Sequence, residues 1–286
     1  MSSDNLNPTT ILSSSITRRL VNTDNGDESI FSQTNVAVWV LMSASAMFLF
    51  MRLWCRHHFS KWWYDDGVLT ITWMILLTAA ALISAAISVG YHTDDAKRTF
   101  FLYQNISTSL TTIGTAWTKV AFALTLMRIM RNIYLRYVLY FVIVTVNLVL
   151  VLGMLSIWIP ACTDPRKHLR PQHDLCFDHM NLMYLGGTTM VYGGLIDVLL
   201  ALFPWFIIHR LLLETREKLG LSFAMSLGFI SGMIVILRTF FQFKRIDNNY
   251  HYLAFLAIFN FLEPCVNIIA QTTPQLRVFC HRYKQA

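Results

Sequence analysis

Four ionisable residues interrupt long apolar stretches of this chain: Lys119, Asp197, Arg238 and Glu263. A charge inside such a stretch is expensive if the stretch crosses a membrane, so each residue is a candidate binding residue. The helical rise places Lys119, Asp197 and Glu263 at similar depth, whereas Arg238 lies nearer one end and is expected to snorkel toward the interface.

Two interpretations of these residues stay open. In the first, Lys119, Asp197 and Glu263 line a cavity that binds or transforms a small molecule. Asp197 or Glu263 would then donate a proton and Lys119 would be the charge partner. In the second, the charges pair with one another or with backbone and fix how the helices pack, although buried pairs add little net stability.

The elements that carry these residues are seven apolar stretches, each long enough to cross a bilayer at about 20 residues. They cover residues 35–53, 67–90, 101–127, 137–159, 180–208, 219–243 and 250–273. We predict an all-α membrane protein, a seven-transmembrane-helix bundle over residues 35–276. Residues 1–34, rich in Ser, Thr, Asn and Asp, are expected to form a disordered tail outside the membrane, and residues 277–286 a short cytoplasmic tail.

Charge and composition support this assignment. Hydrophobic residues make up 55% of the chain and charged residues 14%, against about 25% in soluble domains. With the amino terminus outside or in a lumen, twelve Lys and Arg residues face the cytoplasm and nine face outward, which favours that orientation. The net charge of +7 forms no basic stripe interleaved with aromatics, so nucleic-acid binding is excluded and membrane lipid is the expected surrounding.

The loop between the fourth and fifth stretches contains Cys162 and Cys176. We predict a disulfide between them, which requires that this loop lie in an oxidising compartment; two unpaired thiols are the alternative. No Cys or His spacing indicates a metal site. Asn105 begins a glycosylation sequon, but it lies so close to the membrane that its use is not expected. Pro264, next to Glu263, is expected to kink the last stretch.

With these residues located, the chain resembles the fungal rhodopsin-domain family of integral membrane proteins. That family includes proteins encoded in mycotoxin clusters such as that of satratoxin, and receptor-like proteins of plant-pathogenic fungi. The resemblance covers residues 52 to about 274. Its matching positions include Asp65-Asp66-Gly67, Gly90-Tyr91-His92, Lys119, Arg128-Ile129, Cys162, Pro165, Cys176, Asp197, Pro204, Arg238 and Glu263. Asp65, Asp66, Arg128 and Pro264 are expected to have structural roles.

The resemblance implies an accessory or enzymatic component of a secondary-metabolite pathway that binds or acts on an apolar intermediate. The alternative is a seven-helix receptor for surface or chemical cues, with a G protein as partner. Neither hypothesis requires a cofactor. Retinal is not expected, because no lysine occurs in residues 250–273 to form its Schiff base and Lys119 lies in a different stretch. The sequence shows no inverted repeat of the kind found in many transporters, so a transporter is the weaker hypothesis.

Overall fold

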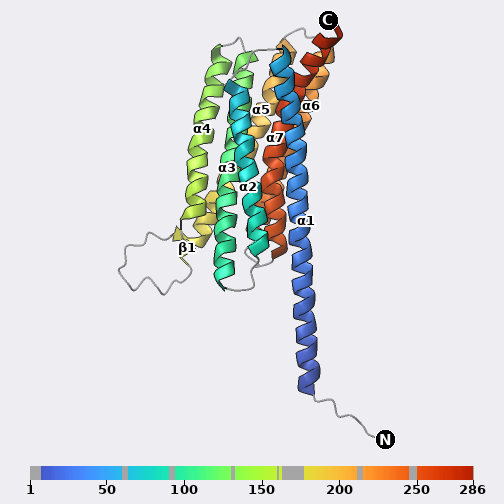
Figure 1. Ribbon diagram of the computed structural model, residues 1–286. Coiled ribbons are helices and arrows are strands. Elements are labelled where there is room, and N and C mark those ends of the chain that lie inside the picture. Colours follow the sequence, from blue (N-terminus) through green and yellow to red (C-terminus); the bar gives the residue numbers. More distant parts are fainter. Residues whose placement is uncertain are drawn as a thin grey trace.

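The structure is a computed structural model, which describes the backbone of residues 8–59, 64–89, 94–129, 133–159, 161–162, 177–210, 215–244 and 250–285. Side chains are described for residues 30–58, 64–89, 95–96, 98–128, 133–159, 180–203, 226–243 and 254–273. In this part of the chain seven long helices run alternately up and down (Figure 1). They are α1 (Pro8–Phe59), α2 (Tyr64–Val89), α3 (Asp94–Ile129), α4 (Ile133–Trp158), α5 (His179–Arg210), α6 (Thr215–Lys244) and α7 (Tyr250–Gln285).

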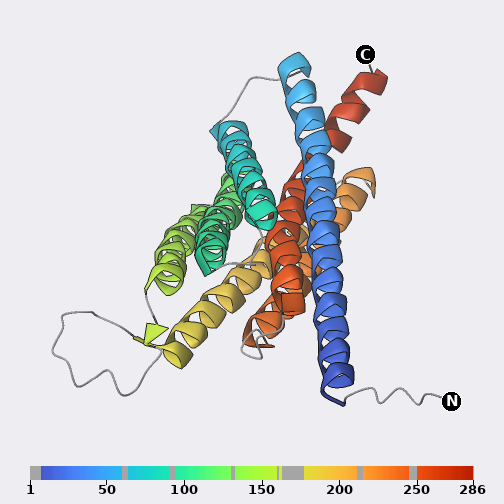
Figure 2. The same ribbon diagram turned by 60° about the horizontal axis from the view of Figure 1, so that its bottom comes forward.

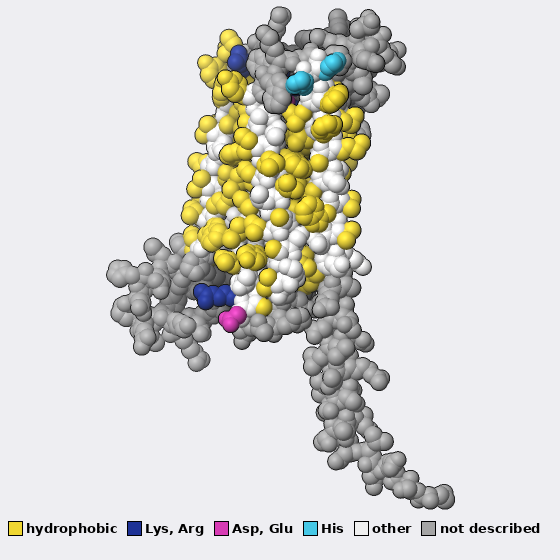
Figure 3. All heavy atoms as spheres, in the orientation of Figure 1, with side chains coloured by type: hydrophobic (Ala, Val, Ile, Leu, Met, Phe, Trp, Pro, Cys, Tyr) yellow, Lys and Arg dark blue, Asp and Glu magenta, His cyan; other side chains and the backbone are white. Residues whose placement is uncertain are grey.

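The outside of the bundle suits a lipid environment. Large apolar side chains such as Phe50 on α1, Phe141 on α4 and Phe229 on α6 are more than 60% exposed. Figure 3 shows apolar side chains over the middle of the bundle, while the coloured charged groups of that face lie near its two ends. Within the described residues, six helices are long and apolar enough to cross a membrane: α1, α2, α4, α5, α6 and α7. The chain is therefore a multi-pass membrane protein.

The helix outside that set is α3, which is long but less apolar. It packs against α2, α4, α5 and α7. Its inward face is polar, with Gln104, Ser107, Thr111, Thr118 and Lys119 all buried. A helix surrounded by other helices can carry polar groups that a lipid-facing helix cannot, since the groups find partners inside the bundle. Composition alone therefore establishes six of the seven expected spans.

The first helix is longer than the sequence predicted. α1 begins at Pro8, so it covers most of residues 1–34, where we expected a disordered tail. A segment that continues an existing helix avoids the unfavourable nucleation step, and no proline interrupts residues 9–59. Beside it lies α7, in both views of the ribbon (Figures 1 and 2).

A pair of two-residue strands is the exception to the all-helical fold. β1 (Ala161–Cys162) pairs in parallel with β2 (Phe177–Asp178), and Ala161 lies opposite Phe177. The pairing brings together the two ends of the loop that the predicted disulfide would close. Cys176 and the side chain of Cys162 lie outside the described residues, so the disulfide stays a prediction.

The two larger of three apolar clusters among the described residues hold most of the helices together. One joins α1, α2 and α7 around Met42, Leu76 and Phe261, and the other joins α3, α4 and α5 around Val142 and Leu200. Where α2 meets α3, a Cβ added at Gly114 would lie 2.7 Å from the Leu76 side chain. Such close approach suits a membrane bundle, where helix association depends on packing.

Candidate functional site

Lys119 is the centre of a buried ionic network. Its ammonium Nζ donates to the Gly193 carbonyl at 2.9 Å, to Asp197 Oδ2 at 3.1 Å and to Glu263 Oε1 at 3.0 Å. An ammonium group has three N–H donors, so all three are used. A Cβ at Gly193 would lie 3.1 Å from Nζ, and the missing side chain leaves the lysine room to reach the backbone. Lys119 therefore contacts both carboxylates, a contact that their similar depth in the sequence analysis had left open.

Glu263 links Lys119 to a second cation. Its Oε2 accepts a hydrogen bond from Arg238 Nη1 at 2.8 Å. The Arg238 side chain is 5% exposed, so the expectation that it snorkels to the interface is wrong. Position along α6 gave its depth but not the direction of its side chain. Glu263 gives the guanidinium an ionic partner inside the bundle, in place of the interface.

Asp197 completes the network on the opposite side of Lys119. Its Oδ2 also accepts from the Ser231 hydroxyl at 3.0 Å, and its Oδ1 from the Asn267 amide at 3.5 Å. Two cations and two carboxylates thus share one cluster, and their formal charges cancel. Because the four side chains come from α3, α5, α6 and α7, the network ties four helices together.

A cavity of about 530 Å³ opens onto this network. It lies between α3, α4, α5, α6 and α7, and Lys119, Arg238 and Glu263 are among its lining residues. On α3 the lining runs from Gln104 to Lys119, which corresponds to about 22 Å along the helix axis. The volume is in the range of small-molecule sites. Its α4 wall is largely apolar, whereas α3 contributes mostly polar residues.

A second, smaller cavity lies on the other side of Lys119. Its volume is about 20 Å³, and Asp197, Asn267 and Gln271 line it together with Lys119. That space suits a single water. Lys119 therefore separates a large space, suited to a small molecule, from a space of water size.

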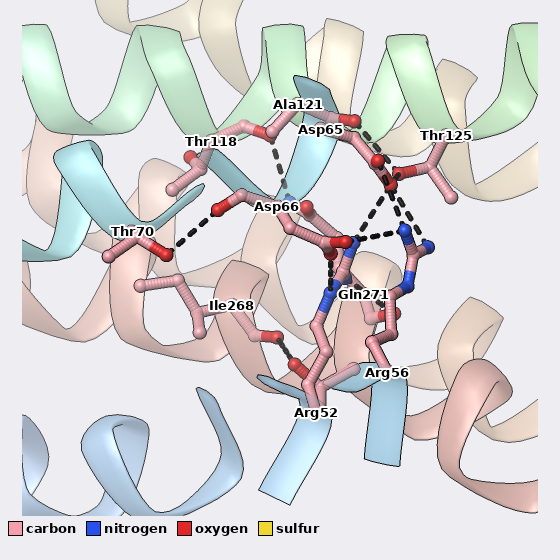
Figure 4. A network of polar contacts seen from close by, with 11 residues as sticks. Arg52, Arg56, Asp65, Asp66, Thr70, Thr118, Ala121, Thr125, Ile268 and Gln271 are labelled. Atoms are coloured by element: carbon pink, nitrogen blue, oxygen red, sulfur yellow. Dashed lines mark hydrogen bonds and ion pairs between the residues drawn. The ribbon is translucent and has the colours of Figure 1, made fainter. Parts of the chain in front are cut away.

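A separate buried network joins the start of α2 to the end of α1 (Figure 4). Arg52 donates to Asp65 Oδ2 at 3.0 Å and to Asp66 Oδ1 at 2.9 Å, and Arg56 binds both carboxylates as well. Thr125 of α3 donates to Asp65 Oδ2 at 3.1 Å. All four charged side chains are at most 6% exposed. The expected structural role of Asp65 and Asp66 has a physical basis in this network.

The sequence analysis did not identify Arg52 and Arg56 as partners of these aspartates. The pattern was available: two arginines four residues apart end one span, and two adjacent aspartates open the next. Residues four apart lie on one face of a helix, so both arginines can face α2. Gln271 was also missed. Its backbone carbonyl accepts from Arg52 at 3.5 Å, and its side-chain amide donates to the carbonyl of Thr118, the residue before Lys119, at 2.8 Å.

The family model described as the fungal rhodopsin domain matches residues 51–282, which is most of the chain. This chain belongs to the fungal rhodopsin domain family. The resemblance found in the sequence is thereby confirmed. No curated protein and no solved structure gave a significant match.

The remaining predicted residues of this fungal rhodopsin domain lie apart from the cavity or at its edge. Arg128 is exposed in the last turn of α3. Pro264 lies within α7, which runs as a helix on both sides of it. Asn105 lines the cavity, and Ser107 of its sequon is buried and donates to the Ala79 carbonyl. A sequon must be accessible, so this position argues against glycosylation. Within the described residues no group of three His, Cys, Asp or Glu side chains is arranged to hold a metal.

Proposed function

We propose that this protein binds a small, mostly apolar metabolite inside its helix bundle, as an accessory component of a fungal secondary-metabolite pathway. The observation that carries the proposal is the cavity of about 530 Å³ that ends at Lys119, Arg238 and Glu263. The α4 wall of this space is largely apolar and α3 contributes polar groups along its length, so the space suits a small molecule with an apolar skeleton and polar substituents. Membership in the fungal rhodopsin domain family is consistent with this role.

The proposal includes α3 as the seventh span. α3 is 36 residues long, and its polar side chains face other helices rather than lipid. With seven spans the amino and carboxyl termini lie on opposite sides of the membrane. The excess of Lys and Arg on one side favours the amino terminus outside or in a lumen. The cavity then lies toward the outer side, where α3 begins and α4 ends.

Binding is better supported than catalysis by an internal acid. Both Glu263 oxygens accept from cationic groups, and Asp197 accepts from Lys119, Ser231 and Asn267. A carboxylate held in this way has to lose a partner before it can act as a proton donor. The arrangement instead provides a fixed polar surface at the inner end of the cavity.

Filling the cavity tests the proposal. Gly153 of α4 lines the cavity, and a Cβ there meets only ordinary contacts of 3.7 Å or more, so Gly153→Leu extends into the open space. The control is Val144→Phe on the lipid-facing side of the same helix, where Val144 is 63% exposed. Deleting the gene should change the profile of secondary metabolites under producing conditions. Wild type and Val144→Phe should restore that profile, whereas Gly153→Leu should not.

An unchanged profile after deletion would refute the pathway role. If Gly153→Leu restores the profile as fully as wild type does, at an equal protein level, the cavity has no part in the pathway role.

A receptor is the second candidate, favoured by one specific observation. The carbonyl of Thr118, the residue before Lys119, accepts from the Gln271 side chain, and the Gln271 backbone carbonyl accepts from Arg52, so bonds along the chain and between helices connect the Lys119 network with the network at the other end of the bundle. Such a chain can couple a ligand to the opposite face only if the helices have two arrangements. Activation of a heterotrimeric G protein by the membrane-embedded protein, abolished by Gly153→Leu, would favour the receptor over the pathway role.

A further inference from the structure

Two residues that line the large cavity each have a buried hydrogen-bonding atom without a partner. Arg238 Nε, a donor, and Asn260 Oδ1, an acceptor, are buried and have no partner among the described residues. Both residues line the cavity and are at most 4% exposed. A buried polar atom without a partner is uncommon in native proteins and calls for an explanation. A ligand in the cavity that provides a partner for each atom explains both.

The two cations at this end of the cavity differ in what they can still bind. Lys119 has already used its three donors on three acceptors. Arg238 has five N–H donors and contacts Glu263 through Nη1, while its Nε–H has no acceptor. A ligand oxygen therefore finds its donor at Arg238 rather than at Lys119.

The unused donor and acceptor lie in the same region. Asn260 precedes Glu263 by three residues on α7, so the two side chains lie on the same face of that helix, one turn apart. Glu263 in turn binds Arg238. A single molecule that contacts Arg238 at the inner end of the cavity is thus within about one helical turn of Asn260.

Charge balance selects the class of ligand. Lys119 and Arg238 are matched by Asp197 and Glu263, so the cluster is already neutral. An anionic or cationic ligand would leave an uncompensated charge inside the bundle, which is costly. A neutral molecule with a carbonyl oxygen for Arg238 and a hydroxyl donor for Asn260 satisfies both atoms without adding charge.

The third unpartnered atom points to a different occupant. Gln271 Oε1 is also buried without a partner, but Gln271 lines the cavity of about 20 Å³. One water fits there. Only the two atoms of the large cavity are therefore assigned to the ligand.

We propose that the ligand of the large cavity is an uncharged oxygenated compound with a carbonyl group and a hydroxyl group. Its carbonyl oxygen accepts from Arg238 Nε, its hydroxyl donates to Asn260 Oδ1, and its hydrocarbon skeleton lies against the apolar residues of α4. This inference rests on the proposed function, because it names the class of metabolite that the same cavity binds.

Five probes of one skeleton test this assignment: tetralin, 1-tetralone, 4-hydroxy-1-tetralone, the anion tetralin-1-carboxylate and the cation 1-aminotetralin. Binding is measured on the full-length protein in lipid nanodiscs. Gly153→Leu in the same nanodiscs corrects for probe that partitions into lipid. We expect 4-hydroxy-1-tetralone to bind best, 1-tetralone about tenfold more weakly and tetralin weakest. The two charged probes should bind no better than tetralin.

Two variants assign each contact. Arg238→Lys keeps a cation for Glu263 but has no Nε–H, so it should lose the preference for 1-tetralone over tetralin. Asn260→Leu should lose the preference for 4-hydroxy-1-tetralone over 1-tetralone and keep the other. Val144→Phe, on the lipid face, should keep both preferences.

The failures are distinguishable. If a charged probe binds best, or if Arg238→Lys and Asn260→Leu keep the wild-type preferences, the inferred ligand class is wrong while the cavity still binds small molecules. If no probe, tetralin included, binds wild type better than Gly153→Leu, the inference and the proposed function both fail.

Discussion

At the residue scale, the stability of the site depends on the balance between two cations and two carboxylates. Lys119 contacts both carboxylates, and Arg238 contacts one. Removing one member of a buried ion pair leaves an uncompensated charge, which costs more than the complete pair contributes. Each member of this network should therefore be intolerant of single replacement and more tolerant of paired replacement.

The first prediction concerns Lys119. Lys119→Met leaves Asp197 and Glu263 with one cation between them, and we expect a loss of about 3–5 kcal/mol of stability. The measurement is reversible unfolding in mixed micelles. The double variant Lys119→Met with Asp197→Asn keeps the Arg238–Glu263 pair and restores charge balance, so it should recover part of the loss. A double variant less stable than the single variant would contradict the charge-balance account.

The second prediction concerns Asn260 in the ligand-free protein. Its Oδ1 is buried without a partner. Asn260→Leu removes that unsatisfied acceptor and should raise stability by about 1 kcal/mol. The thermal unfolding midpoint of the purified protein checks this. A fall in the midpoint would show that Asn260 serves packing rather than a ligand.

At the element scale, the join between α1 and α2 depends on Arg52, Arg56, Asp65 and Asp66. Four buried charges in mutual contact fix the end of α1 against the beginning of α2, and Thr125 adds α3 to the same cluster. The arrangement positions α3, the helix that carries Lys119.

The third prediction tests this join. Asp66→Asn leaves Arg52 and Arg56 with one carboxylate, and we expect a loss of about 3–5 kcal/mol. Asp95→Asn, at an exposed position in the first turn of α3, removes the same charge without a buried partner and is the control. Equal stability of Asp66→Asn and Asp95→Asn would contradict a structural role for the cluster.

The element scale also explains what could be predicted from the sequence. Apolar length located the helices, and helical rise placed Lys119, Asp197 and Glu263 at one depth, where they meet. Rise says nothing about which way a side chain points, so Arg238 was misplaced at the interface. Pairing between different helices has no local sequence pattern, which is why Arg52, Arg56 and Gln271 were missed. Gln271 is uncharged, so it did not stand out within a span as the four ionisable residues did.

At the scale of the whole molecule, the bundle is asymmetric along its axis. The large cavity lies at the end where α3 begins and α4 ends, and the four-residue ionic cluster lies at the other end, where α1 ends and α2 begins. The Lys119 network lies between them. This order suits a protein that admits a small molecule from one side and keeps the other side closed.

The fourth prediction concerns topology. If α3 spans the membrane with the other six helices, an epitope tag at the amino terminus and one at the carboxyl terminus lie on opposite sides of the membrane. Protease protection of both tags in sealed vesicles checks this. Protection of both tags together, or of neither, would mean an even number of spans.

The central claim is that the large cavity lined by Lys119 holds a small molecule. Native mass spectrometry of the protein, extracted in lipid nanodiscs from the cells that naturally make it, tests this most directly. The account predicts an added mass of one small, uncharged compound on wild type and on Val144→Phe, and none on Gly153→Leu. The same mass excess on wild type and Gly153→Leu, or none on wild type from producing cells, would contradict it.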